Sequence, residues 1–125
     1  MAESTPEIDD IDFTPAGEDE VPAVAFATFP DAETARTIAL ALVKEGIVAC
    51  VNLLPGATSI YRWEGEIEEA TEIVGIIKTA QDRVGDLLQR LQELHPYDVP
   101  ELIVLPVVAG NADYLDWVIA STRSE

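Results

Sequence analysis

The feature that most constrains this chain is a two-residue turn, Glu64-Gly65, between two long β-rich runs. One run covers about residues 47–63 and the other about residues 66–78, which predicts a long antiparallel hairpin. Both strands are far longer than the opening strand at 23–29 that they must join, so their outer halves cannot all be paired inside one subunit. Because unpaired strand edges invite association, we expect a symmetric oligomer in which other subunits cover them.

A strand and a helix precede the hairpin. The run at 23–29 is short and apolar, which favours a buried strand. Asp31 is placed to cap a helix that Gly46 closes. Its apolar residues recur at helical spacing and comprise Ala35, Ile38, Ala39 and Leu42. Pro55-Gly56 then breaks the first hairpin strand, which is predicted to resume at Thr58.

A second helix follows the hairpin and has the cleanest periodicity in the chain. Thr79 and Asp82 are spaced as a capping box for its start, and Pro96 stops it. Its apolar stripe comprises Val84, Leu87, Leu88, Leu91 and Leu94.

The last part of the chain adds a strand and a short helix. An almost uninterrupted apolar run within residues 101–109 predicts the strand, with Pro106 marking a bulge or an unpaired edge. Asn111 is placed to cap the final helix. With right-handed crossovers, the strand–helix–strand–strand–helix–strand order predicts an α+β, ferredoxin-like βαββαβ sandwich with an extra C-terminal helix.

Charge separates a tail from this folded body. Residues 1–22 hold eight acids and no lysine or arginine, so the tail carries −8 and the rest −9 of a net charge of −17. Its few apolar residues cannot offset the entropy of ordering, which predicts a disordered acidic tail over 1–22 and one domain over 23–125. A partner-binding role for the tail is the alternative.

Composition excludes several classes of protein. With 24 acids and 7 bases, the chain lacks the clustered Lys and Arg that bind nucleic acid or anionic membranes. No apolar run approaches the roughly 20 residues that cross a bilayer, and the first residues lack a signal-peptide pattern. A single cysteine excludes an internal disulfide framework. We therefore expect a cytoplasmic protein without nucleic-acid or membrane partners.

The common enzyme motifs are missing, so we expect no enzyme and no catalytic residue. Cys50 lies in an apolar strand without an adjacent positive charge, which favours a core cysteine over a metal ligand or a nucleophile. His95, the only histidine, is predicted in an exposed, proline-stiffened loop with Tyr97, Asp98 and Glu101. With carboxylates, this imidazole suits Cu(II), Zn(II) or Ni(II). The alternative is that it only caps the preceding helix.

The hairpin turn places Tyr61, Arg62 and Trp63 together, either as packed turn aromatics or as a patch facing a ligand or another subunit. An acidic run follows the turn and comprises Glu66, Glu68, Glu69 and Glu72. We interpret this run as a solvated face, with loose attraction of divalent cations as the alternative.

Several ordered segments together resemble the CutA divalent-cation tolerance family. They read VACVNLLPGATSIYRWEGEIEE, IIKT, LHPYDVPELIVLP and DYLDW, in this order along the chain. The resemblance runs from about Val24 to Trp117, and the WEG turn with the HPY-x-x-PE loop is specific to it. The acidic tail lies outside the resemblance.

The resemblance implies a homotrimer of ferredoxin-like subunits whose hairpins pair across subunits, an architecture similar to the PII signalling trimers. It also implies tolerance to copper and other divalent metals, with Cu(II) bound by some members. Cys50 and His95 match positions proposed as metal-associated. The residues expected at the clefts between subunits are Trp63, Glu64, Lys78, Tyr97 and Glu101.

Three positions depart from the family pattern. Some members carry cysteines where this chain has Ala27 and Arg90, and a histidine where it has Leu94. A thiolate-rich site cannot form here, so a copper site must rely on His95 and carboxylates. We expect a trimeric divalent-cation tolerance protein that binds copper or other divalent cations and has no organic cofactor. The alternative is a PII-like signalling or scaffold trimer that binds a small metabolite or a partner segment in its clefts.

Overall fold

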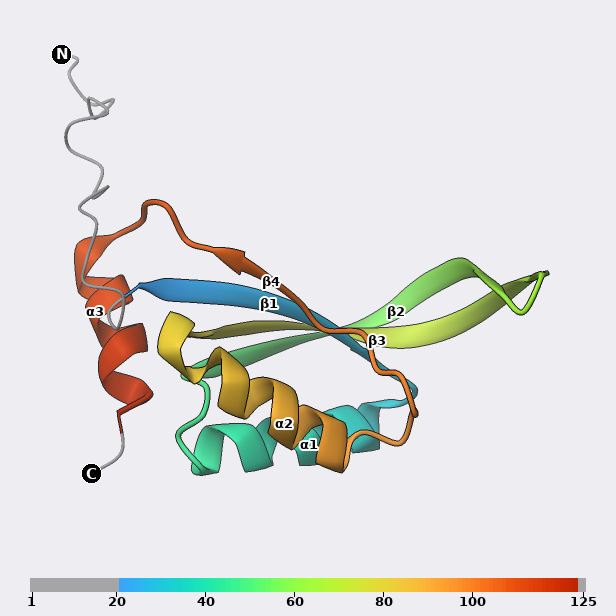
Figure 1. The fold of residues 1–125 in the computed structure, drawn as a ribbon, viewed down its shortest axis with the longest axis horizontal. Helices are drawn as coiled ribbons and strands as arrows, with labels where there is room; N and C mark the ends of the chain where they lie inside the picture. Colours follow the sequence, from blue (N-terminus) through green and yellow to red (C-terminus); the bar gives the residue numbers. More distant parts are fainter. Residues whose placement is uncertain (1–20, 124–125) are drawn as a thin grey trace, which may run out of the picture.

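The computed structural model describes residues 21–123, in which one four-stranded antiparallel sheet has the strand order β2-β3-β1-β4. The elements are β1 (Pro22–Phe29), α1 (Ala32–Lys44), β2 (Cys50–Trp63), β3 (Glu66–Ala80), α2 (Val84–Leu94), β4 (Ile103–Pro106) and α3 (Ala112–Ser121). Helices α1 and α2 cover one face of the sheet, and α3 lies at the end where β1 begins (Figure 1). The predicted ferredoxin-like fold with a long hairpin and an extra C-terminal helix is confirmed. Of the predicted tail, residues 1–20 lie outside the described residues.

Local signals set the ends of α1 and α3. The carboxylate of Asp31 accepts a hydrogen bond from the Thr34 backbone N–H at 2.8 Å, and Gly46 takes a positive φ of 73° just after α1. The side-chain oxygen of Asn111 accepts in the same way from the Tyr114 N–H at 3.1 Å. Both predicted N-caps are therefore confirmed.

The core lies between the sheet and the two helices. Alternate residues of β1 are buried, because successive side chains of a strand point to opposite faces. Three of these are alanines and the fourth is Phe29, which leaves room for the buried side chains of α1 and α2. The apolar side chains that complete this core include Ile38, Leu42, Ile73, Ile77, Leu87 and Leu91.

The hairpin is continuous and longer than its neighbours. β2 and β3 pair from Cys50–Lys78 to Trp63–Glu66, with a register shift between Leu54 and Ala57. The break predicted at Pro55-Gly56 is therefore wrong, since a bulge accommodates these residues within one strand. β1 pairs with β3 only as far as Ile73, so residues 57–72, here called the projecting hairpin, extend beyond the rest of the sheet (Figure 1).

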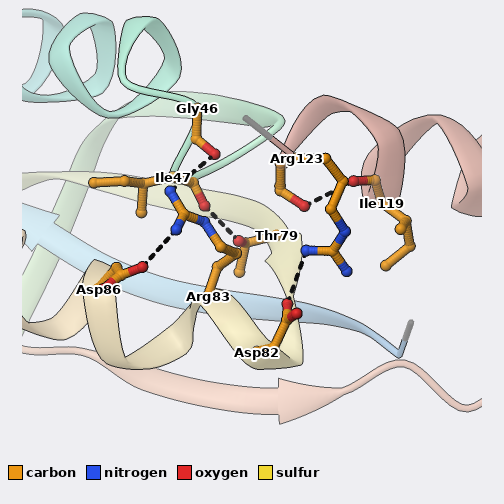
Figure 2. A network of polar contacts seen from close by, with 9 residues as sticks. Gly46, Ile47, Thr79, Asp82, Arg83, Asp86, Ile119 and Arg123 are labelled. Atoms are coloured by element: carbon orange, nitrogen blue, oxygen red, sulfur yellow. Dashed lines mark hydrogen bonds and ion pairs between the residues drawn. The ribbon is translucent and has the colours of Figure 1, made fainter. Parts of the chain in front are cut away.

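The predicted capping box of α2 is wrong. A 3₁₀ turn, Gln81–Arg83, precedes α2, and neither start has a side-chain cap. The Thr79 hydroxyl instead donates to the buried carbonyl of Ile47 at 2.7 Å (Figure 2). In the same network Arg83 binds Asp86, and an ion pair between Arg123 and Asp82 joins the end of α3 to the start of α2.

The strand predicted within residues 101–109 is shorter than expected. β4 is a four-residue edge strand that pairs with β1 and ends at Pro106. Proline has no backbone N–H to donate to a neighbouring strand, which favours the end of the strand there. Across residues 21–123, none of the helices combines the length and the apolar character needed to cross a bilayer.

Candidate functional site

His95 ends α2 and turns its ring into the protein. Its backbone is extended, with φ −78° and ψ 139°, because Pro96 disfavours helical geometry in the preceding residue. The ring stacks on Phe29 with centroids 5.4 Å apart, and only 6% of the residue is exposed. The exposed loop position predicted for this histidine is therefore wrong, although Tyr97, Asp98 and Glu101 of the same loop are exposed.

Both ring nitrogens of His95 have backbone partners. Nδ1 accepts a hydrogen bond from the Tyr97 N–H at 3.1 Å, and Nε2 lies 2.7 Å from the Thr28 carbonyl oxygen. Because the carbonyl can only accept, we assign the proton to Nε2. The ring therefore joins the loop to β1, and its one lone pair, on Nδ1, is already in use.

Tyr97 reaches from this loop to the hairpin. Its hydroxyl donates to one carboxylate oxygen of Glu72 at 3.0 Å, and the Ser59 hydroxyl donates to the other at 2.6 Å. We call these three residues the Glu72 cluster. Burial of the phenol and the hydrogen bond to Glu72 raise the pKa of Tyr97 above its ordinary value, with smaller contributions from Tyr61 and Asp31.

Glu72 is the residue of this cluster whose burial the sequence did not predict. It was predicted to lie on a solvated face with the other acids after the turn, but only 8% of it is exposed. It immediately precedes the apolar run that begins at Ile73, where the hairpin joins the sheet. That position was the one available signal, since an acid at the start of a buried run requires polar partners.

Cys50 and Lys78 lie directly opposite each other in the β2–β3 ladder. The Lys78 ammonium donates to the side-chain oxygen of Asn52, and the Cys50 thiol lies 3.8 Å from the same oxygen. His95 binds the carbonyl of Thr28, whose partner in β3 is Val74. Lys78 lies four residues further along β3 than Val74. Four strand residues span about 13 Å, so Cys50 and His95 of one subunit cannot bind the same ion.

Trp63 and Glu64 lie at the tip of the hairpin. Glu64 and Gly65 both have positive φ, 50° and 82°, as a two-residue hairpin loop requires. Trp63 is 55% exposed and pairs with Glu66, six residues along β3 from Glu72. Six strand residues span about 20 Å, so the tip lies far from Tyr97 within one subunit.

The predicted site residues therefore fall in three places. Trp63 and Glu64 are at the hairpin tip, His95, Tyr97 and Glu101 are on the loop before β4, and Cys50 and Lys78 are at the start of the hairpin. Among residues 21–123, no three His, Cys, Asp or Glu side chains come together in a way that could hold a metal ion. The geometry of one described subunit thus does not fit a metal centre built from His95 and Cys50.

Comparison with known proteins defines the family. The family model described as "CutA1 divalent ion tolerance protein" matches residues 23–121. The chain belongs to this family. The "Divalent-cation tolerance protein CutA" of Thermus thermophilus is 50% identical over 99 residues, which cover 79% of this chain and 96% of that relative.

Solved structures of CutA1 proteins share the fold. The structure of the Thermus thermophilus protein has a TM-score of 0.80 at 48% identity and covers 82% of this chain and 99% of its own. The Oryza sativa CutA1 structure has a TM-score of 0.82 at 37% identity, with coverage of 87% and 100%. The structural likeness therefore extends over nearly the whole length of each CutA1 chain.

The three positions expected to depart from the family pattern have structural contacts in this chain. Ala27 is fully buried in β1, and Leu94 packs against the core. Arg90 binds both carboxylate oxygens of Glu45 at 2.8 Å and also pairs with Glu93. Arg90 thus joins α2 to the end of α1, and it holds the pKa of the Glu45 carboxyl below its ordinary value.

Proposed function

We propose that this CutA1 family member acts in tolerance to divalent cations as a homotrimer that binds Cu(II) or another divalent cation and catalyses no reaction. The family and the relatives found are named for divalent-cation tolerance. A net charge of −17 favours cations near the surface. Assembly and cation binding rest on different observations.

The projecting hairpin carries the case for assembly. Beyond the Phe29–Ile73 pair, residues 66–72 of β3 have β2 as their only strand partner within the described chain. β2 is itself one of the two edge strands of the sheet. Free N–H and C=O groups along such edges pair readily with another chain, which supports hairpin pairing between subunits.

The face of the sheet opposite α1 and α2 supports the same conclusion. Its exposed side chains include Leu54, Ile103 and Leu105. Monomeric proteins rarely leave a large apolar patch in water. The number of three subunits is inferred from the resemblance to the family. Assembly of such a trimer would bury this face of the sheet.

His95 is the proposed nitrogen ligand of the cation. An ion at Nδ1 would displace the Tyr97 N–H, and a neutral hydrogen bond of this kind contributes only about 0.5–1.5 kcal/mol. Imidazole with carboxylates is a ligand set that Cu(II) accepts. The other ligands would come from Asp98 and Glu101 of the loop or from acids of a neighbouring subunit. Cys50 is a separate, second candidate ligand.

Solution mass tests the assembly. Light scattering on the full-length protein should give three times the 13.6 kDa of one chain. A double substitution of the hairpin aromatics, Tyr61→Ser with Trp63→Ser, should lower this mass at micromolar concentration. A monomer of wild-type protein at every concentration would contradict the proposed trimer.

Calorimetric titration with Cu(II) on metal-stripped protein tests cation binding. We expect saturable binding near one ion per chain that His95→Gln abolishes. Cys50→Ser tests the separate candidate ligand and should leave the His95-dependent binding intact, as should a variant lacking residues 1–20, which removes most of the acidic tail. Weak binding that is unchanged in His95→Gln would contradict the site and identify the acids as a diffuse cation sink.

A PII-like signalling or scaffold trimer is the second candidate function. The exposed indole of Trp63 at the hairpin tip favours it, because exposed aromatics often contact ligands or partners. A metabolite panel should then change the tryptophan emission of wild type but not of Trp63→Phe, in which Trp117 reports the background. Unchanged emission in wild type across the panel would contradict binding of those metabolites at this position.

A further inference from the structure

We propose that the Glu72 cluster fastens the projecting hairpin to the loop of residues 95–101, so that loop and hairpin move as one body. The hairpin would then present its subunit-pairing edges at an angle fixed by Tyr97. Only this consequence for assembly rests on the proposed trimer. The fastening itself is a property of the single chain.

Glu72 occupies the position where a hairpin of this length would bend. Its ladder partner is Ala57, the first residue beyond the bulge that begins at Leu54. β1 ends its pairing with β3 one residue later, at Ile73. At this point the sheet narrows to two strands, and the ladder next to it is already irregular. A contact from outside the two strands therefore controls the direction of the hairpin most strongly here.

The contact is made by a buried carboxylate held by hydroxyl groups. The ion pairs found within residues 21–123 join Arg83, Arg90 and Arg123 to other acids, and none reaches Glu72. A buried carboxylate without a counter-ion is costly unless hydrogen bonds replace its contacts with water. Hydrogen bonds to a charged acceptor are about twice as strong as those between neutral groups. Ser59 and Tyr97 are thus the groups that make burial of Glu72 tolerable.

Tyr97 is fixed at its other end by His95. The Tyr97 N–H binds Nδ1 of the imidazole, and the two rings lie with centroids 4.7 Å apart. His95 in turn binds the Thr28 carbonyl at the end of β1. A continuous series of contacts therefore runs from β1 through His95 and Tyr97 to Glu72 in the hairpin. Packed side chains and hydrogen bonds that form such a connected network can carry coupling between distant segments.

Hydrogen exchange on the full-length protein tests this fastening directly. Tyr97→Phe removes the hydroxyl and keeps the ring that packs on His95. We expect exchange of amides in residues 57–60 and 69–72 to accelerate about tenfold, because the variant loses one hydrogen bond to a charged group. Amides of β1 and α1 should keep their wild-type rates. Tyr114→Phe, which removes a hydroxyl from α3, is the matched control and should leave the hairpin unchanged.

Ser59→Ala extends the test to the second donor. Because Ser59 and Tyr97 share one carboxylate, the double variant should accelerate exchange by a factor different from the product of the two single effects. Wild-type exchange in residues 57–60 and 69–72 of Tyr97→Phe would overturn the proposal. Acceleration spread equally over β1 and α1 would also overturn it, since that pattern reports global destabilisation.

A dilution series measured by light scattering tests the consequence for assembly. Tyr97→Phe should dissociate at a severalfold higher protein concentration than wild type, while Tyr114→Phe should match wild type. Equal dissociation of Tyr97→Phe and wild type would overturn control of the assembly angle. If wild type were monomeric, the proposed trimer would fail, whereas the exchange experiment would still decide whether Glu72 fastens the hairpin.

Discussion

Gly75 lies directly against the ring of Phe29. A Cβ atom at position 75 would be 2.9 Å from Cε2 of this ring, closer than carbon atoms can pack without displacement. Phe29 is fully buried in β1 and stacks on His95. The absence of a side chain at position 75 therefore allows the ring to lie against β3, where it stacks on the imidazole.

Gly75→Ala should destabilise the protein by about 1–3 kcal/mol, because overpacking moves Phe29 or the strand. The free energy of unfolding from urea titration measures this effect. Gly85→Ala is a control of opposite sign: a Cβ there meets no atom within 4 Å, and alanine favours the helix by up to about 1 kcal/mol. Wild-type stability of Gly75→Ala would show that the Phe29 ring is free to move.

The fold could be predicted from local patterns because those patterns act over a few residues. Asp31 and Asn111 cap helices through N–H groups three residues away. The Glu64-Gly65 turn fixes the hairpin register in the same local manner. The number and order of helices and strands therefore follow from local spacing, and the ferredoxin-like arrangement follows from adding the crossover rule.

The candidate site could not be predicted in this way, because its partners are distant in sequence. The ring of His95 is buried by Phe29 and Thr28, and Glu72 is buried through Tyr97. No sequence pattern within residues 95–101 or 66–72 indicates which distant residues these side chains will contact. The prolines of the loop and the charges of the acidic run suggested exposure, and tertiary contacts reversed that expectation for His95 and Glu72.

Thr79→Val should destabilise the protein by about 1–3 kcal/mol. Valine has nearly the shape of threonine, but it leaves the buried carbonyl of Ile47 without the hydroxyl donor at 2.7 Å (Figure 2). Urea unfolding compares it with Thr71→Val, an exposed position in the same strand, where we expect a change within about 0.5 kcal/mol. Equal stability of the two variants would indicate that water replaces the lost donor.

Glu45→Gln should lower stability at neutral pH and remove part of its acid dependence. Arg90 holds the pKa of Glu45 below its ordinary value of 4.5, so the stabilisation is present above that pH and is lost as the pH falls through the folded-state pKa. Wild type and variant should therefore converge in acid, and high salt should also reduce their difference. In an Arg90→Gln background, Glu45→Gln should have no further effect on unfolding, and an undiminished effect would assign the pKa shift to another group.

Tyr97→Phe should flatten the alkaline part of the stability curve. Burial and the bond to Glu72 raise the pKa of Tyr97 above its ordinary value of 10.0, so the folded protein keeps a proton that the unfolded chain releases. This contribution is complete below about pH 10 and is lost as the pH rises through the folded-state pKa. Urea unfolding at a series of alkaline pH values measures the slope, which should be smaller for the variant. Glu72→Gln leaves the phenol of Tyr97 buried but removes the neighbouring negative charge. The slope for Glu72→Gln should therefore lie between those of wild type and Tyr97→Phe. Parallel slopes for wild type and Tyr97→Phe would mean that the phenol ionises equally in the folded and unfolded chains.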